Sequence, residues 1–262
     1  KGKERVDTLD SFRGIGLLQH AFKIMEWALM AGVWREVVRV LDEEILGFLP
    51  NRSNCQALWR VRVENDRRNK EGEPWVWLSL DLKACFDTVL REVGLAASEG
   101  LGVDPRWARR WERLWEGLTA TVRVAGERGG LVRWERGVVQ GGVASPQLFV
   151  VLSLLFVRGN KASHPNAVQV VVADDGLIGI AKSELGDLIK KMLEGYERYY
   201  MEVAAGKTKV FGMGDLMGED PVHIAGKDVK VEMDVMKHLG AVLPLKSETR
   251  LPGKAERRLS TV

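Results

Sequence analysis

The stretch that decides the fold is Val170-Val171-Val172-Ala173-Asp174-Asp175-Gly176-Leu177-Ile178-Gly179-Ile180. Apolar and mostly β-branched runs stand on both sides of an acidic pair, which is typical of two buried strands joined by a tight turn. Apolar surroundings strongly penalise a carboxylate that has no partner. We therefore expect Asp174 and Asp175 to lie at the tip of a hairpin and to meet a cation there.

A third carboxylate, Asp81, ends another strand-like run, Trp75-Val76-Trp77-Leu78-Ser79-Leu80. Mg²⁺ prefers hard oxygen ligands, and two-metal sites need carboxylates that reach both ions. The three aspartates together predict a divalent-metal site for phosphoryl or nucleotidyl transfer, provided that the strands before Asp81 and Asp174 lie side by side. Taken alone, Asp174-Asp175-Gly176 is also the pattern of a plain β-turn, because Asp-Gly is common in hairpin turns.

The chain has 262 residues, 45% hydrophobic and 29% charged, and a formal net charge of +3. This composition predicts a globular protein with a substantial core. The longest apolar run, from Leu148 to Val157, is well short of the roughly 20 residues that span a bilayer, so we expect no membrane association. The first residue is Lys1, and we interpret the chain as part of a longer protein.

Basic residues gather in two places, on a helix expected at 54–70 and near the C-terminus. Such clusters are typical of a nucleic-acid surface or of a solvated helix face, and the pattern leaves both open. On the first reading, Arg60 and Arg67 are candidate contacts to a nucleic-acid template.

Periodicity predicts helices over 18–44, 54–70 and 84–97, and others that begin at Asp104-Pro105, Ser145-Pro146 and Ser183. A hairpin is expected at 119–137, and short strands are expected at 208–212, 222–231 and 236–243. The order of these elements predicts an α+β fold in which helices pack on one face of an antiparallel sheet.

Several segments, in chain order, resemble the reverse transcriptases, most closely those of non-LTR (LINE-type) retrotransposons. Asp81-Leu82-Lys83-Ala84-Cys85-Phe86-Asp87-Thr88-Val89 is similar to polymerase motif A, the run from Gly137 to Phe149 to motif B, and the aspartate pair to motif C. Gly47-Phe48-Leu49-Pro50-Asn51-Arg52-Ser53 and the run from Ser11 to Lys23 resemble fingers motifs. Gly206-Lys207-Thr208-Lys209 resembles motif D, and His238-Leu239-Gly240 resembles motif E. Val172 departs from the pattern, because an aromatic residue usually stands there.

The resemblance implies a role for each matching residue. Asp81, Asp174 and Asp175 would hold two Mg²⁺ ions, with Mn²⁺ as a substitute, and Lys207 would protonate the leaving pyrophosphate. Arg13 would clamp the incoming triphosphate, and Gln140 and Gly141 would line the nascent base pair. The Phe86 ring would exclude a 2′-hydroxyl and so select dNTPs, although Phe86 is also what a core aromatic after a strand would look like. Leu239 and Gly240 would contact nucleic acid.

The implied protein is an RNA-directed DNA polymerase that extends a DNA or RNA primer on an RNA template. Its expected parts are fingers at 1–74, a palm with embedded fingers elements at 75–235, and the motif E strand with the start of a truncated thumb at 236–262. An intracellular location is expected, in the cytoplasm and nucleus of a eukaryotic host. The alternatives are an RNA-binding scaffold that does not polymerise, an intron-encoded maturase, which the run Gln140-Gly141-Gly142 also fits, and a viral RNA-dependent RNA polymerase, which Phe86 disfavours.

Overall fold

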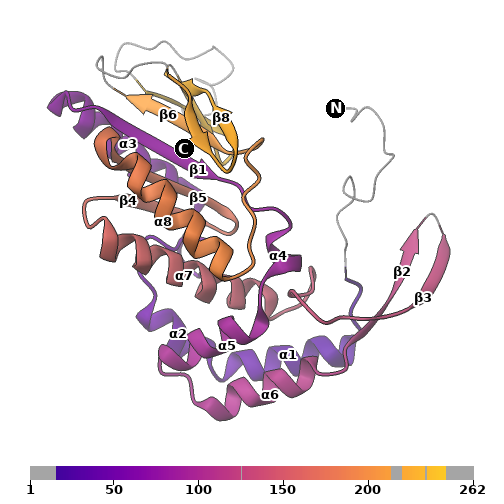
Figure 1. Cartoon of the computed structure of the whole chain (residues 1–262). Coiled ribbons are helices and arrows are strands. Elements are labelled where there is room, and N and C mark those ends of the chain that lie inside the picture. The colour runs from indigo at the N-terminus through magenta and orange to yellow at the C-terminus, as the bar shows by residue number, and fades with distance from the viewer. Residues whose placement is uncertain (1–15, 125, 214–219, 234, 246–262) are drawn as a thin grey trace.

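A computed structural model describes residues 16–124, 126–213, 220–233 and 235–245 (Figure 1). Its helices are α1 (His20–Ala31), α2 (Trp34–Val40), α3 (Asn54–Glu71), α4 (Cys85–Thr88), α5 (Arg91–Gly100), α6 (Pro105–Trp115), α7 (Ser145–Ser163) and α8 (Leu185–Arg198). Its strands are β1 (Trp75–Leu80), β2 (Thr119–Val124), β3 (Glu127–Arg133), β4 (Val168–Val172), β5 (Asp175–Ala181), β6 (Lys209–Met213), β7 (Val222–Ile224), β8 (Lys227–Val229), β9 (Val231–Glu232), β10 (Val235–His238) and β11 (Ala241–Pro244).

The central sheet has the strand order β4-β5-β1-β6-β9. Strand β1 lies in its middle and pairs antiparallel with both β5 and β6, and only the short β6–β9 contact is parallel. Helices lie against this sheet (Figure 1). The predicted α+β fold with an antiparallel sheet is therefore confirmed.

Both faces of the sheet are covered. Helices α7 and α8 pack on one face, against side chains that include Val76 and Leu78 of β1. The other face packs against α3 and the β10–β11 hairpin, and it includes Trp75 and Trp77. The sequence prediction placed helices on one face only. The second cover agrees with the burial of β1, because Trp75 and Trp77 are as fully buried as the neighbouring Val76 and Leu78.

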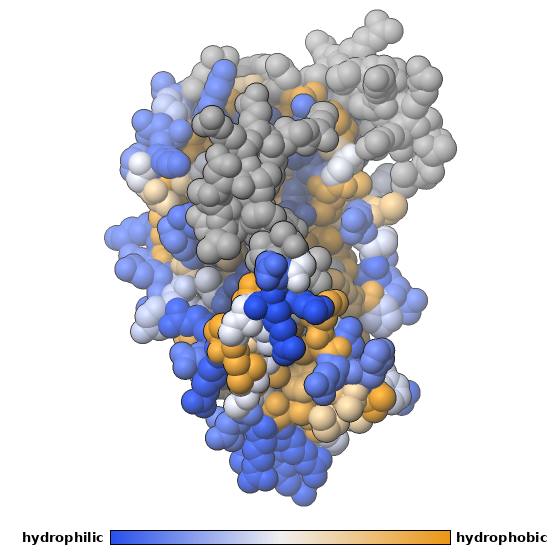
Figure 2. Space-filling model, turned by 90° about the vertical axis from the view of Figure 1, so that its right-hand side faces the viewer, coloured by the Kyte–Doolittle hydropathy of each residue, from blue (hydrophilic) through white to orange (hydrophobic). Residues whose placement is uncertain are grey.

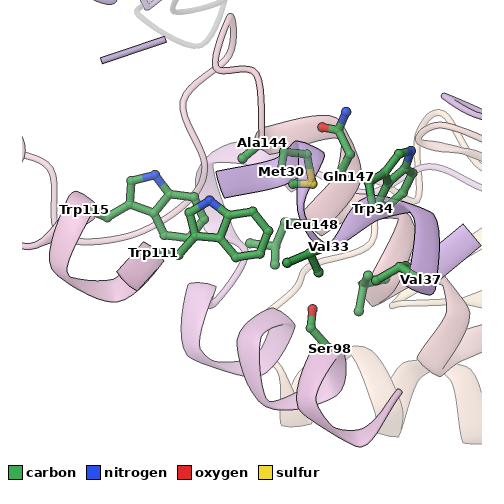
Figure 3. Close-up of a pocket in the computed structure, with 11 residues that line it drawn as sticks. Met30, Val33, Trp34, Val37, Ser98, Trp111, Trp115, Ala144, Gln147 and Leu148 are labelled. Atoms are coloured by element: carbon green, nitrogen blue, oxygen red, sulfur yellow. The ribbon is translucent and has the colours of Figure 1, made fainter. Parts of the chain in front are cut away.

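A second group of helices, α1, α2, α5 and α6, packs on the side of α7 that faces away from the sheet (Figure 1). The buried indoles of Trp111 and Trp115 stack there with centroids 6.3 Å apart. A small cavity remains between these helices (Figure 3). Trp111 Nε1 and Gln147 Oε1 have no hydrogen-bond partner. The tryptophans of α6 are thus core residues.

Several predicted elements are interrupted by turns. The helix expected over 18–44 is two helices, and at the break between them an added Cβ on Gly32 would lie 2.8 Å from the Trp107 ring. The helix expected over 84–97 is likewise split into α4 and α5. The strands expected over 222–231 and 236–243 are hairpins, turning at Ala225-Gly226 and Leu239-Gly240. Both turns have two residues with positive φ, which is the type I′ geometry that suits hairpins.

None of the helices in the described part of the chain combines the length and the apolar character that crossing a bilayer would require.

Candidate active site

The acidic pair lies at the turn between β4 and β5, as predicted. Val172 and Asp175 are the last paired residues of the two strands, so the turn consists of Ala173 and Asp174. Ala173, the first turn residue, has a φ of 56°, a positive value that a non-glycine residue seldom adopts. A left-handed conformation costs a non-glycine residue about 1–2 kcal/mol. The surrounding structure therefore has to hold this turn in place.

The sheet register carries Asp81 to the same end of the sheet. Leu80, the last residue of β1, pairs with Gly176 of β5. One further step along this antiparallel ladder sets Asp81 opposite Asp175, on the same face, because directly opposed residues share a face. Gly176 is therefore a strand residue opposite β1 and not part of a β-turn, so the pattern Asp175-Gly176 is not explained by a turn.

The charges of the three aspartates affect one another. Desolvation by the surrounding chain raises the pKa of Asp175, and the negative charges of Asp174 and Asp81 raise it further. Burial raises the pKa of the nearby Cys85 thiol to about 12, with further contributions from Asp174 and Asp81. Carboxylates that repel one another at one end of a sheet form a site that favours a cation.

Lys207 is brought to this cluster by the loop that follows α8. The Ala204 N–H donates to the Asp81 carbonyl over 2.7 Å, and the Lys207 N–H donates to the Ala204 carbonyl over 2.8 Å. Lys207 Nζ then lies 3.5 Å from Asp81 Oδ1, and its side chain is 68% exposed. The structure thus places an ammonium group next to the first of the three carboxylates, with freedom to move toward a ligand.

The donor set of this site suits hard divalent ions, because carboxylate oxygens are the ligands that Mg²⁺ and Mn²⁺ prefer. In the described part of the chain, no three His, Cys, Asp or Glu side chains are arranged so that they could hold a metal ion as they stand. The fit to a metal therefore rests on the type and mutual repulsion of the carboxylates, and not on their coordination geometry.

Phe86 and the motif B loop contact each other and α7. The Phe86 ring stacks on Phe149 of α7, with centroids 4.7 Å apart and planes at 16°. The Phe86 carbonyl accepts from the Val138 N–H over 2.7 Å, and Gln140 Nε2 is 3.4 Å from Asp87 Oδ2. The helical turn α4 and the loop from 137 to 142 are therefore joined, with a half-buried aromatic ring between the sheet and α7.

Gly141 has a φ of 106°, and an added Cβ would lie 2.8 Å from the Gly16 carbonyl oxygen. The Gly16 N–H donates to the Gln140 carbonyl over 2.8 Å. Glycine is needed here because the backbone of Gly16 comes close. The lining of a nascent base pair by Gln140 and Gly141 stays a prediction. Asp87 was not among the predicted site residues. Burial raises the pKa of Asp87. Its place within the segment that resembles motif A was the sequence signal that could have marked it as a candidate.

The segment before α3 supports the acidic turn between β4 and β5 from outside the sheet. The Val171 N–H donates to the Glu44 carbonyl, and the Val171 carbonyl accepts from Leu46 over 2.7 Å and from Gly47 over 3.3 Å. An added Cβ on Gly47 would lie only 2.2 Å from the Ala173 backbone nitrogen. This segment therefore packs directly against the strained turn that carries Asp174.

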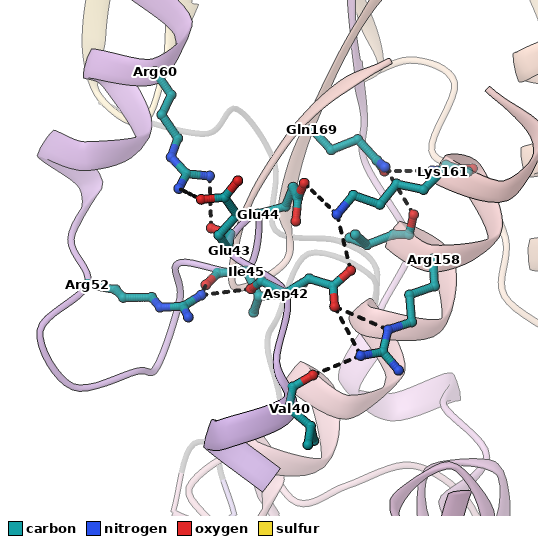
Figure 4. Close-up of polar contacts among 12 residues, drawn as sticks. Val40, Asp42, Glu43, Glu44, Ile45, Arg52, Arg60, Arg158, Lys161 and Gln169 are labelled. Atoms are coloured by element: carbon teal, nitrogen blue, oxygen red, sulfur yellow. Dashed lines mark hydrogen bonds and ion pairs between the residues drawn. The ribbon is translucent and has the colours of Figure 1, made fainter. Parts of the chain in front are cut away.

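Charged contacts fix the same segment to α7 (Figure 4). Asp42 accepts from Arg158 at 3.0 Å and from Lys161 at 3.2 Å, and Lys161 also contacts Glu44 at 2.7 Å. Arg52 donates to the carbonyls of Asp42 and Ile45. Burial alone would raise the pKa of Asp42, but the hydrogen bonds from Arg158 and Lys161 outweigh it and lower that pKa. Arg52, in the segment from Gly47 to Ser53 that resembles a fingers motif, thus holds this loop together.

The two predicted template arginines are both engaged within the chain. Arg60 donates to the Glu43 carbonyl over 2.9 Å and pairs with its carboxylate at 3.0 Å (Figure 4). Arg67 pairs with Glu64 at 2.6 Å and with Glu71 at 3.3 Å. These carboxylates compete with any nucleic-acid phosphate, and a template contact by either arginine stays a prediction.

Three other predicted residues remain, two in the β10–β11 hairpin and one outside the described residues. Leu239 and Gly240 form the turn of the β10–β11 hairpin, and Leu239 packs against the core on the α3 side of the sheet. Their contact with nucleic acid stays a prediction. Arg13 lies outside the described residues.

Comparisons with known proteins agree with this geometry. The model of the family "Reverse transcriptase (RNA-dependent DNA polymerase)" matches residues 1–242, and the chain belongs to the reverse transcriptase family. No curated protein matches the sequence.

Solved structures of telomerase share the fold. The telomerase of Candida tropicalis in complex with a TWJ fragment of telomeric RNA superposes with a TM-score of 0.57 at 14% identity, over 80% of this chain and 36% of that one. The corresponding complex of Candida albicans gives 0.52 at 15% identity, over 92% and 40%. The apo telomerase of Candida tropicalis gives 0.52 at 13%, over 80% and 38%. The chain thus spans well under half the length of these structures.

Proposed function

We propose that this chain is the RNA-directed DNA polymerase part of a retroelement protein, and that it adds dNTPs to a DNA or RNA primer on an RNA template. The observation that carries the proposal is the ladder between β1 and β5, which sets Asp81 opposite Asp175 with Asp174 in the adjoining turn. The domain division follows the same assignment, with fingers at 1–74, palm at 75–235 and the start of a thumb from 236.

Asp81, Asp174 and Asp175 would hold the metal, for which we propose two Mg²⁺ ions, with Mn²⁺ as a substitute. Bound there, the ions would activate the primer 3′-hydroxyl and offset charge on the reacting phosphate. Lys207, already beside Asp81, is placed to give a proton to the departing pyrophosphate. Phosphoryl transfer depends mainly on positioning and electrostatic stabilisation, and these side chains supply both.

Phe86 supports a preference for deoxynucleotides. Its stacking on Phe149 limits where the ring can go, so a 2′-hydroxyl arriving at the ring would meet a side chain that cannot easily withdraw. This argument favours reverse transcription over the copying of RNA into RNA.

The test is primer extension on an RNA template with Asp174→Asn. Losing one metal ligand removes several kcal/mol of transition-state stabilisation, so extension should fall roughly a thousandfold or more. Asp220→Asn makes the same chemical change at an exposed aspartate outside the three proposed metal ligands and should extend like the parent. Undiminished extension by Asp174→Asn would refute the proposal. RNA binding by the parent without any extension would favour the non-polymerising scaffold.

The motif pattern supports a non-LTR retrotransposon as the source, which would put the protein in the cytoplasm and nucleus of a eukaryotic host. The run Gln140-Gly141-Gly142 also fits an intron-encoded maturase. The gene around this segment separates the two, because a maturase reading frame lies inside a self-splicing intron and a retrotransposon frame does not.

A further inference from the structure

The β2–β3 hairpin extends away from the helices and the central sheet (Figure 1). Its strands pair only with each other among the described strands, and every residue of β3 is exposed. A lone two-stranded hairpin is marginally stable in water. A ligand bound to its exposed side chains would therefore stabilise it.

One face of this hairpin carries three arginines. Cross-strand pairs join Thr119 to Arg133, Thr121 to Leu131 and Arg123 to Arg128. The register shifts by one between the second and third pairs, so β3 holds an extra residue there while β2 alternates without interruption. All six side chains therefore lie on one side, which we call the arginine face (Thr119, Thr121, Arg123, Arg128, Leu131 and Arg133).

The arrangement is unfavourable unless an anion is present. Like charges directly opposite one another on a sheet destabilise it, and the bulge turns Arg128 toward Arg123. None of the ion pairs among the described residues includes Arg123, Arg128 or Arg133. This contrasts with Arg60 and Arg67 on α3, whose guanidinium groups are neutralised within the chain.

The base of the hairpin is held firmly and leads into the site. The Trp134 N–H donates to the Leu118 carbonyl over 2.7 Å, and Arg91 donates to the Trp134 carbonyl over 2.8 Å. The chain then enters the motif B loop at Gly137. Figure 2 looks onto the side of the molecule to which the hairpin points, and strongly hydrophilic side chains gather there beside hydrophobic ones.

We infer that the arginine face binds the phosphate backbone of a nucleic acid strand. Arginine suits phosphate because its planar donors match the phosphate oxygens, and threonine hydroxyls can add hydrogen bonds to the same backbone. Such contacts position a strand without reading its sequence. The inference rests on the proposed function in taking the strand to be the RNA template.

The test measures binding of a labelled RNA template annealed to a DNA primer by fluorescence anisotropy at several salt concentrations, without metal or dNTPs. The variant is Arg123→Gln/Arg128→Gln/Arg133→Gln. Each lost contact to single-stranded backbone lowers the salt slope by about 0.7, so three should lower it by about 2 and weaken binding roughly a hundredfold at 0.1 M salt.

The matched control, Arg109→Gln/Arg113→Gln/Arg198→Gln, removes the same charge from exposed helix positions and should change the slope far less. A second variant, Arg123→Lys/Arg128→Lys/Arg133→Lys, keeps the charge and should keep the slope. The inference is overturned if the hairpin glutamine variant has the same affinity for RNA and the same salt slope as the helix control. In that case the arginine face either contacts an acidic protein or has no ligand.

Failure of the inference and failure of the proposed function can be told apart. If Asp174→Asn abolishes extension but the hairpin glutamine variant binds RNA with the same salt slope as the parent, only the inference is wrong. If no extension occurs in any variant but the slope falls by about 2, the hairpin binds nucleic acid in a protein that does not polymerise.

Discussion

Substitution of Gly47 by alanine tests how the acidic turn between β4 and β5 is held in place. The new Cβ would lie 2.2 Å from the Ala173 nitrogen and 3.0 Å from the Val172 carbonyl carbon, both of them backbone atoms. Ordinary contact begins near 3.4 Å, so the two segments must separate by about 1.2 Å. Because no flexible side chain can move aside, the hairpin that carries Asp174 has to shift.

The expected cost has two parts. Overpacking of this kind destabilises by about 1–3 kcal/mol. Weakening the hydrogen bonds from Leu46 and Gly47 to the Val171 carbonyl adds about 0.5–1.5 kcal/mol for each bond that is lost. We expect the free energy of unfolding to fall by about 2–4 kcal/mol. A misplacement of about 1 Å can also slow a positioned reaction roughly a hundredfold.

Urea unfolding measures the first effect, and primer extension well below the unfolding transition measures the second. Gly186→Ala is the control, because a Cβ there meets nothing within 4 Å in the first turn of α8. It should change stability by no more than about 0.5 kcal/mol and leave extension unchanged. The reasoning fails if Gly47→Ala unfolds within about 0.5 kcal/mol of the parent and extends at the parent's rate.

Two further changes address selectivity and acid stability. Phe86→Val should let ribonucleotides compete with deoxynucleotides, because it removes the ring stacked on Phe149; an unaltered ratio of rNTP to dNTP incorporation would contradict this role. Asp42→Asn should cost about 1–3 kcal/mol at neutral pH. The folded pKa of Asp42 is lowered, so its contribution is fully present above the unfolded pKa of about 4 and is lost as pH falls from there through the folded pKa. Urea unfolding should therefore show a smaller difference from the parent at pH 3 than at pH 7.

Local sequence patterns were sufficient for some elements. Helix α3 begins after Ser53 with the capping box that the residues Ser53 and Gln56 allow, and α6 begins after Asp104 with proline in its first turn. The acidic hairpin followed from strand periodicity on both sides of Asp174. These features depend on residues close together in the chain, so a short window of sequence contains the physical cause.

Other features depended on distant partners. The helix pattern over 18–44 gave no sign of the break at Gly32, where a tryptophan from α6 occupies the space of a side chain. The basic residues of α3 suggested a template surface, but Glu43 and Glu64 neutralise Arg60 and Arg67. The sequence pattern did not indicate an arginine cluster on β2 and β3, because only the cross-strand register and the bulge bring these arginines onto one face.

The sequence by itself determined the family, the fold class and which three aspartates are the candidate metal ligands. Each of these rests on residue types at short spacing. Only the tertiary structure decided which charges are free and which are paired, and how the acidic turn is supported. The reason is physical: Asp81 and Asp175 become neighbours through strand pairing across more than 90 residues, and the loop containing Gly47 holds the turn by backbone contacts that no side-chain pattern records.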